Sequence, residues 1–266
     1  MMLLAFTKNG KMLIATLWIQ QESGFSEVDF VVDLLMKINH MHKVSEPSIL
    51  YFGTPVVLIT TCNSDGTYNI APISSIFWLG WRAIIGISAF SKTTENIRRT
   101  RECVLNLPSV NQADAVNRLA LTTGTFPVPI GKLEKGYRYV ADKFATAQLT
   151  PKPSETVDAP RIEECPVQME VVVESMHGLA EGDPAQEGRL LTFELRVQRI
   201  YLDELILMKG NPDRVDPDKW RPLIMSFQQF YGLGEQVHVS KLSSIPEHLY
   251  RSYDVERAKL IKSFVK

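Results

Sequence analysis

The chain has 266 residues, of which 45% are hydrophobic, and its 29 Lys and Arg against 30 Asp and Glu leave a formal net charge of -1. This balance offers no surface-wide attraction for nucleic acid or anionic lipid, and no apolar run reaches the roughly 20 residues of a membrane-spanning helix. We therefore expect a globular, cytoplasmic protein of one large or two small domains.

Residues 1–44 carry the weakest signals and are interpreted as an N-terminal extension. Residues 12–19 are apolar, but the polar residues 20–22 that follow offer no signal-peptide cleavage site. Residues 28–38 have the apolar spacing of a helix. An amphipathic appendage and a dispensable stretch from a start codon placed too early both fit, and we prefer the second.

The first hairpin is predicted over residues 56–70, where two apolar runs flank the polar turn of residues 63–67. Pro72 interrupts strand pairing just beyond it because proline has no N–H to donate. Short polar side chains surround this point: Asn69, Ser74 and Ser75. Freed backbone groups beside them can meet a planar polar ring or a hydroxylated chain, although a bulged strand edge explains the same residues.

A second apolar run, residues 83–87, returns the chain to Ser91, Lys92 and Thr93, which open a short helix over residues 94–101. The first turn of a helix has free N–H groups and a positive dipole end, so it suits an anion. Ser91 or Thr93 can cap this helix, and Lys92 adds a cation. An ordinary capped surface helix with a solvated basic end is the alternative.

Four large rings gather around this second run: Phe77, Trp78, Trp81 and Phe90. They can line a ligand pocket, but large rings between β-runs more often belong to a core or a dimer interface.

The middle of the chain is predicted to be mostly irregular. Residues 109–112 fit an S-x-x-Q capping box, so we expect a helix after them that Gly124 stops. Residues 125–166 are proline-rich, with one short helix near residues 137–145. So long a loop is usually functional or a partner contact.

Regular strands are predicted to resume after this segment. Residues 167–173 and 191–198 alternate apolar and polar side chains, as half-buried antiparallel strands do. Residues 202–208 are predicted to form a last short strand. The charged tail, residues 236–266, is expected on the surface with a helix over residues 247–264.

Several chemistries are disfavoured by missing motifs. The chain has no G-x-G-x-x-G, no P-loop and no G-x-S-x-G. Its three cysteines, Cys62, Cys103 and Cys165, are far apart and predict reduced thiols. Neither they nor the five histidines have the spacing of metal ligands, so no metal site is expected.

Taken in order, five segments resemble one known family. They are Asn69-x-Ala71-Pro72-x-Ser74-Ser75, residues 91–100, residues 104–108, residues 112–120, and residues 159–167 with Glu170. Over residues 45–235 the chain resembles the flavin reductase-like family of FMN-binding split barrels, which includes flavoredoxin. The resemblance implies a mainly β fold, a six-stranded antiparallel split β-barrel with Greek-key connections and flanking helices, in a homodimer that binds FMN.

The resemblance also implies a set of cofactor-binding residues. Lys92, Thr93 and Thr94 would hold the FMN phosphate. The ribityl chain and ring would lie along five residues: Asn69, Ala71, Pro72, Ser74 and Ser75. Ser88 and Ser91 are secondary candidates, and no catalytic residue is assigned. A purely structural role is the alternative to cofactor binding: Lys92 as a surface cation, Thr93 and Thr94 as helix caps, and Ser74 and Ser75 as polar strand residues.

The function implied is an NAD(P)H-dependent flavin reductase, whose FMN accepts hydride and passes electrons to free flavin, an acceptor protein or a small molecule. Many such reductases carry Gly-Asp-His on a late strand, whereas this chain has Gly182-Asp183-Pro184 and a His177 expected in a turn. An electron carrier that binds FMN without a nicotinamide site is therefore the alternative. A dimeric barrel without cofactor is a third.

Overall fold

The computed structural model describes residues 2–8, 11–17 and 42–264. The chain separates into two compact units, Met1–Ser48 and Ile49–Lys266. In the first unit, β1 (Met2–Lys8) and β2 (Lys11–Leu17) pair as an antiparallel hairpin. The helix expected over residues 28–38 lies outside the described residues.

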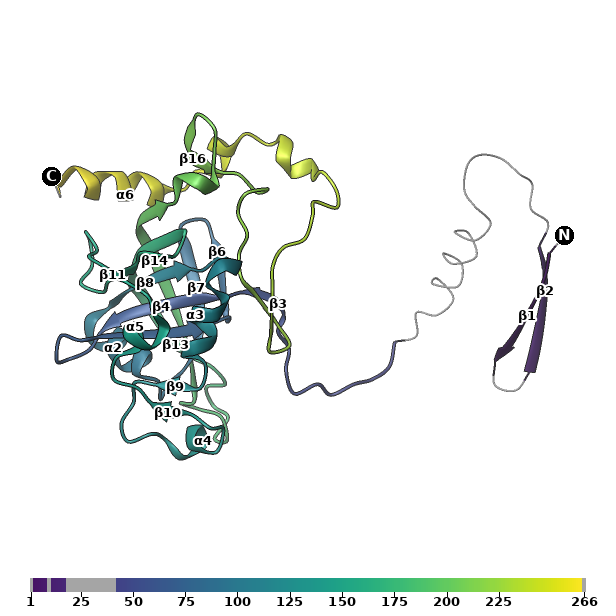
Figure 1. The fold of residues 1–266 in the computed structure, drawn as a ribbon, viewed down its shortest axis with the longest axis horizontal. Helices are drawn as coiled ribbons and strands as arrows, with labels where there is room; N and C mark the ends of the chain where they lie inside the picture. Colours follow the sequence, from purple (N-terminus) through teal and green to yellow (C-terminus); the bar gives the residue numbers. More distant parts are fainter. Residues whose placement is uncertain (1, 9–10, 18–41, 265–266) are drawn as a thin grey trace. The chain divides into compact units, whose positions relative to one another are not determined.

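The main sheet of the second unit holds seven strands (Figure 1). They are β4 (Val57–Cys62), β5 (Tyr68–Ile73), β6 (Ile76–Leu79), β7 (Arg82–Ser88), β8 (Glu102–Leu107), β13 (Val167–Gly178) and β14 (Leu190–Leu202). Their order is β5-β4-β8-β13-β14-β7-β6, and neighbours pair antiparallel. The mainly antiparallel β fold is confirmed. The sheet has one strand more than the six expected. The additional strand is β6, which pairs with β7 at one edge of the sheet; for its residues only a cluster of aromatic rings was expected.

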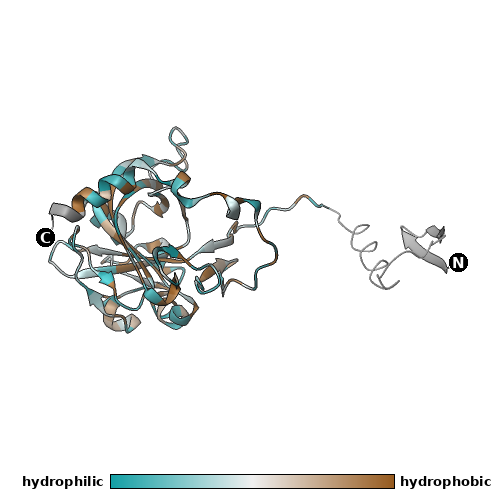
Figure 2. Cartoon of the chain, turned by 90° about the horizontal axis from the view of Figure 1, so that it is seen from above, coloured by the Kyte–Doolittle hydropathy of each residue, from teal (hydrophilic) through white to brown (hydrophobic). Residues whose placement is uncertain are grey.

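Two apolar cores cover the two faces of this sheet. The larger core includes Ile59, Ile85 and Phe193, all fully buried. The second core lies between β4–β5 and two helices, α3 (Ala113–Leu119) and α5 (Lys143–Ala147), and includes Leu58 and Ile70. In Figure 2 the strands of the sheet accordingly carry both hydrophobic and hydrophilic residues. Alternate residues of β4 and β5 thus serve different cores, which fixes the face that each side chain takes.

The segment between β8 and β13 contains more structure than expected. Its short elements are β9 (Thr122–Thr123), α4 (Ile130–Leu133), β10 (Arg138–Tyr139), α5, β11 (Pro151–Lys152) and β12 (Arg161–Ile162). The helix expected near residues 137–145 was placed too early, because Asp142 caps the N–H of Ala145 and starts α5. Gly124 does not stop α3: the helix ends at Leu119 with Ala120 as its C-cap, and Leu121 takes a φ of 54°.

Strand β13 departs from the predicted alternation. Gln168 and Glu170, expected to face solvent, are 7% and 0% exposed. The reason is a segment folded over that face: Glu170 accepts hydrogen bonds from the N–H groups of Glu155 and Thr156, and Arg161 donates to Gln168. This polar network ties the proline-rich segment to the sheet.

The remaining elements are β3, two short helices next to β8, and the elements that follow β14. They are β3 (Phe52–Pro55), α2 (Lys92–Thr100), η1 (Val110–Gln112), η2 (Glu204–Ile206), β15 (Leu207–Met208), β16 (Asn211–Val215), β17 (Ile224–Ser226), β18 (Gln229–Tyr231), η3 (Lys241–Ser244), η4 (Glu247–Tyr250) and α6 (Tyr253–Phe264). The capping box at residues 109–112 is confirmed. The strand expected over residues 202–208 is wrong for its first part, which is β14 and η2. No described helix is long and apolar enough to cross a membrane.

The C-terminal tail lies on the surface as expected, with residues 236–251 all exposed, but α6 packs against the rest of the unit at a few positions. The helix expected over residues 247–264 is divided into η4 and α6. On α6, Asp254 is 9% and Ala258 7% exposed. The Arg82 guanidinium donates to both carboxylate oxygens of Asp254, at 2.9 and 3.3 Å. An ion pair between the sheet and the tail therefore holds α6 in place.

Candidate functional site

The turn between β4 and β5 is held by its own side chains. The Asp65 carboxylate accepts hydrogen bonds from the N–H and hydroxyl of Thr67, at 3.0 and 2.6 Å, and the Thr67 hydroxyl lowers the pKa of that carboxyl. Asn63 Nδ2 donates to Thr67 Oγ1 at 2.9 Å. This turn sets the predicted hairpin in register with Thr61 opposite Asn69. Asn69 is consequently buried, 2% exposed, although it is polar.

Helix α2 begins at Lys92, two residues earlier than expected. Ser91 is its cap, since its hydroxyl accepts the N–H of Thr94 at 3.0 Å. The Thr94 hydroxyl donates to the Ser88 carbonyl at 2.6 Å and is fully buried. Thr94 and Ser88 therefore fix the loop that leads into α2. The N–H groups of Lys92 and Thr93 belong to the first turn, where no helical carbonyl can accept them.

Asn69 joins β5 to α2 and also meets a third segment. Its Nδ2 donates to Thr93 Oγ1 at 3.0 Å, while its Oδ1 is buried without a hydrogen-bond partner among the described residues. Gly124 lies against this atom: a Cβ there would be 2.7 Å from Asn69 Oδ1 and 3.2 Å from Lys92 Cγ. Only glycine lets the backbone approach this closely. A buried acceptor without a partner is costly and points to a group that the chain itself does not supply.

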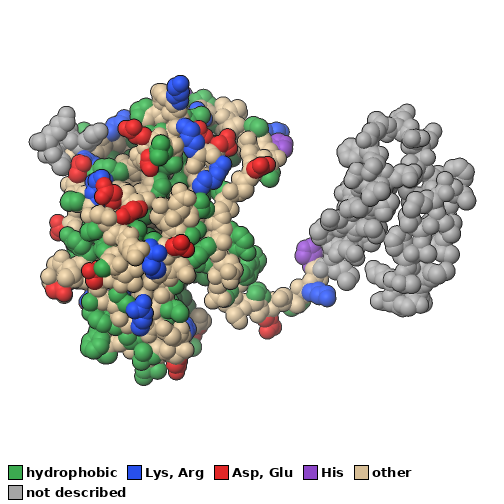
Figure 3. Space-filling view, viewed as in Figure 1, with side chains coloured by type: hydrophobic (Ala, Val, Ile, Leu, Met, Phe, Trp, Pro, Cys, Tyr) green, Lys and Arg blue, Asp and Glu red, His purple; other side chains and the backbone are tan. Residues whose placement is uncertain are grey.

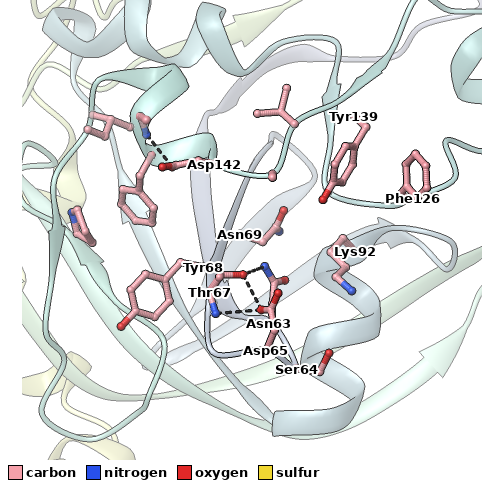
Figure 4. A pocket seen from close by; sticks show the side chains of 17 residues that line it. Asn63, Ser64, Asp65, Thr67, Tyr68, Asn69, Lys92, Phe126, Tyr139 and Asp142 are labelled. Carbon is pink, nitrogen blue, oxygen red and sulfur yellow. Dashed lines mark hydrogen bonds between the residues drawn. The ribbon is translucent and has the colours of Figure 1, made fainter.

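A cavity of about 700 Å³ opens beside these residues. The hairpin turn forms one wall and the segment of residues 124–151 the other. Figure 4 shows Asn69 between the turn residues and the ring of Tyr139, with Lys92 on the side of Phe126. The rings of Phe126 and Tyr139 contact each other with 5.2 Å between their centroids. Polar groups, a cation and aromatic rings thus meet in one hollow.

Lys92 lines the cavity together with two carboxylates, Asp65 and Asp142, and two further lysines, Lys132 and Lys143, belong to the segment that forms its second wall. Lys92 pairs with the exposed Glu95 at 2.7 Å. Lys132 Nζ donates to Thr123 Oγ1 at 3.1 Å, and Lys143 Nζ, on a residue only 4% exposed, donates to the Ile70 carbonyl at 3.0 Å. Burial lowers the pKa of Lys132, and burial together with the charge of Lys132 lowers the pKa of Lys143 to about 8. Within the described part of the chain neither Lys132 nor Lys143 has a carboxylate partner, and neither side chain lines the cavity.

The structure distributes the ten predicted site residues over two places. Asn69 and Lys92 line the cavity, with Thr93 bonded to Asn69. The others lie outside its walls: Ala71 and Pro72 on β5, Ser74 and Ser75 between β5 and β6, and Ser88, Ser91 and Thr94 before and in α2. The Ser75 hydroxyl is 2.7 Å from the Tyr51 hydroxyl. The backbone carbonyl of Ser75 accepts a hydrogen bond from the N–H of Gly86 on β7.

Other residues of the site could not be predicted. Phe126 and Tyr139 come from residues 125–166, expected to be a long loop whose length was the only signal, and Gly124 was expected only to stop a helix. His177 is on β13 rather than in a turn; it is exposed, and its Nε2 is 3.2 Å from Ser175 Oγ.

The ring cluster divides into two pairs. Trp78 and Trp81 pack against the larger core, while Phe77 and Phe90 are 52% and 63% exposed. The core interpretation therefore holds for the two tryptophans.

Known proteins resemble this chain in sequence and in structure. The family model for the flavin reductase-like domain matches residues 49–233. The Bacillus subtilis (strain 168) protein YdfE is 35% identical over 206 residues, which are 77% of this chain and 96% of YdfE. The flavoredoxin of Desulfovibrio vulgaris (Miyazaki F) has a TM-score of 0.61 at 21% identity, covering 77% of this chain and 99% of its own. A flavin reductase with a split barrel domain from Shewanella frigidimarina NCIMB 400 has a TM-score of 0.55 at 17% identity, covering 71% and 86%. These likenesses confirm the predicted split-barrel fold.

Proposed function

This chain belongs to the flavin reductase-like domain family, and from that premise we propose that it binds FMN and uses it to transfer electrons from NAD(P)H. Family membership supports a flavin-related oxidoreductase. The choice of FMN, the hydride donor and the residues involved are our proposal. The observation that carries it is the group of Asn69, Lys92 and Gly124 at the start of α2.

These residues fit a phosphate followed by a hydroxylated chain. The free N–H groups of the first turn of α2 and the Lys92 ammonium supply positive charge for a phosphate. The pair of Lys92 with Glu95 is exposed on the Glu95 side and weak enough to be exchanged. The free end of the Asn69 amide can bond a ribityl hydroxyl in either orientation, because a hydroxyl both donates and accepts.

The chemistry divides between the cofactor and the chain. When bound, the flavin supplies the redox step, in which it takes up a hydride and passes the electrons on. The residues of this chain bind and orient: α2 holds the phosphate, and Asn69 fixes the chain that follows it. Edge strand β5, with Pro72 lacking an N–H, leaves main-chain groups available to a flat polar ring.

A second candidate function is an electron carrier without a nicotinamide site. Two observations favour it. By resemblance to the family, Gly182-Asp183-Pro184 is the nearest equivalent of a Gly-Asp-His stretch and lacks its histidine, and the exposed His177 is engaged with Ser175. Reduction by NADH or NADPH under anaerobic conditions separates the two functions. Bleaching of the bound flavin absorbance by either nucleotide supports the reductase, and bleaching by dithionite alone supports the carrier.

We further propose that the protein is a homodimer. Strand β6 is one of the two edges of the main sheet, and its Phe77 and Leu79 are 52% and 70% exposed. An unpaired edge strand with apolar side chains is a liability for a monomer. Light scattering after size-exclusion chromatography should give twice the chain mass of 30.1 kDa, and Leu79→Arg should lower it. A wild-type protein that elutes as a monomer at micromolar concentration would contradict the proposal.

Flavin absorbance retained after gel filtration, followed by titration of flavin fluorescence, tests the FMN site. We expect wild-type protein to retain FMN, and Lys92→Ala to weaken binding by about 10-fold or more, because a charged hydrogen bond contributes about 1.5–3 kcal/mol. Lys135→Ala, which removes an exposed lysine outside the cavity, is the matched control and should bind as wild type. Wild-type protein that binds no FMN at tens of micromolar would refute the assignment.

A further inference from the structure

The chain between β5 and β6 connects the two edges of the main sheet. These strands are at opposite ends of the strand order, yet only Ser74 and Ser75 separate them in the sequence. The two serines therefore cross from one edge of the sheet to the other. The backbone carbonyl of Ser75 accepts the N–H of Gly86 on β7 at 2.8 Å, which fixes the end of the crossing. In the proposed function the flavin ring would lie along β5 and this crossing.

Tyr51 contacts the crossing through its side chain. Its hydroxyl is 2.7 Å from the Ser75 hydroxyl, although Tyr51 lies 24 residues earlier in the chain, just before β3. A phenol is a stronger hydrogen-bond donor than an aliphatic alcohol, so the favoured arrangement has the Tyr51 O–H donating to Ser75 Oγ. That arrangement leaves the proton of the Ser75 hydroxyl free to be donated to a ligand.

The small sheet of β3, β17 and β18 holds Tyr51 in place. The backbone carbonyl of Tyr51 accepts the N–H of Phe227 at 3.0 Å. Phe227 and Gln228 form the two-residue turn between β17 and β18, with φ of 45° and 66°, a conformation that favours glycine. The ring of Phe227 packs edge-to-face on Phe52, with 4.8 Å between the centroids. Backbone strain of this kind persists only where the surroundings hold it, and it is common at ligand sites.

This small sheet also carries exposed apolar side chains. Phe52 and Phe227 are 71% and 44% exposed. In the space-filling view of Figure 3, hydrophobic side chains gather where the small sheet lies. The contact between Tyr51 and Ser75 is therefore at a surface that a ligand can reach.

We propose that Tyr51 is a positioning residue for the flavin: it orients the Ser75 hydroxyl so that this hydroxyl donates its proton to the flavin ring. The inference rests on the proposed function, which supplies the ring. A hydrogen bond donated to the ring stabilises the reduced flavin more than the oxidised flavin, because reduction adds electrons and makes the ring a better acceptor. Tyr51 thus favours reduced FMN through Ser75 and without touching the ring.

The experiment measures the midpoint potential of FMN bound to the full chain, by equilibration with a redox dye. The test variants are Tyr51→Phe, which keeps the ring and removes the hydroxyl, Ser75→Ala, and the two combined. The matched control is Tyr231→Phe, on an exposed tyrosine of β18 in the same small sheet. Each single test variant should lower the preference for reduced over oxidised FMN by about 10-fold, which is about 30 mV for a two-electron couple. The combined variant should fall no further, and the control should match wild type.

Two results overturn the inference while FMN binding, and with it the proposed function, stands. The first is a Tyr51→Phe variant with the wild-type potential; if urea unfolding shows that it is also less stable, the bond only fixes the small sheet. The second is a combined variant whose loss equals the sum of the two single losses, because Tyr51 would then act independently of Ser75. Wild-type protein that binds no FMN refutes the proposed function itself and this inference with it.

Discussion

Lys143 allows a direct test of what a buried positive charge costs the stability of the folded protein. It is 4% exposed, has no acidic partner in the described part of the chain, and has its pKa lowered from 10.5 to about 8. At about 1.4 kcal/mol per pH unit, this fall means that keeping the ammonium charged costs the folded protein about 3 kcal/mol. The value is of the order expected for a buried lysine. Lys143→Met keeps the stem in the core and removes the charge.

The effect must depend on pH in a definite direction. Between pH 8 and 10.5 the unfolded chain keeps a proton on Lys143 that the folded chain has released, so stability rises with pH in this window. Below pH 8 the lysine is charged in both states and the full cost remains. In the FMN-free protein, Lys143→Met should therefore be more stable than wild type at pH 7. Its advantage should shrink by about 2–3 kcal/mol by pH 10.

Urea unfolding at pH 7, 8.5 and 10 measures this difference. Lys135→Met, on an exposed residue of the same segment, controls for removal of any lysine and should follow wild type at every pH. A difference between Lys143→Met and wild type that stays constant from pH 7 to pH 10 would refute the reasoning, because it would mean that the ammonium is solvated. The lost hydrogen bond to the Ile70 carbonyl changes the size of the difference by about 1 kcal/mol but not its slope.

Three further substitutions test other contacts. Gly124→Ala should weaken FMN binding about 10-fold or more, because the new Cβ must displace Asn69 Oδ1 from 2.7 Å; unchanged affinity by fluorescence titration would disprove this contact. Glu170→Gln should lower stability by about 2–3 kcal/mol in urea, because the fully buried carboxylate accepts two backbone N–H groups; a loss below 0.5 kcal/mol would contradict it. Asp254→Asn should lower stability by only about 1 kcal/mol, because its partner Arg82 is one-third exposed, and FMN affinity should not change.

Local patterns predicted the parts of the fold that are set by near neighbours in the sequence. The hairpin of β4 and β5 followed from its polar turn, and Ser91 was one of two caps expected for α2, although the helix begins two residues earlier than predicted; turn and capping preferences act over a few residues. Strand β13 was predicted with the wrong burial. The side of Glu170 that should face water is covered by a segment whose path depends on distant contacts with Thr156 and Arg161.

The candidate site shows the same division. Asn69 and Lys92 carried a signal because the family motif marks them, and the structure places both on the cavity. Gly124 and Tyr139 carried none. Their role depends on how β9 and β10 lie against α2, and no spacing in the sequence encodes that approach. Gly124 was interpreted as the end of a helix, because the sequence does not show that a Cβ at this position would meet Asn69 Oδ1.

The two walls of the cavity are built so differently that they can change independently. One wall is the β4–β5 hairpin and α2, whose residues are hydrogen-bonded to one another and to the central sheet. The other wall is residues 124–151, held by the two-residue pairing of β9 with β10 and by short helices. Substitutions in that second wall can alter the ligand without breaking a ladder of the sheet. Substitutions at Phe126 or Tyr139 are therefore expected to change which ligand the cavity accepts and to leave Asn69 and Lys92 in place.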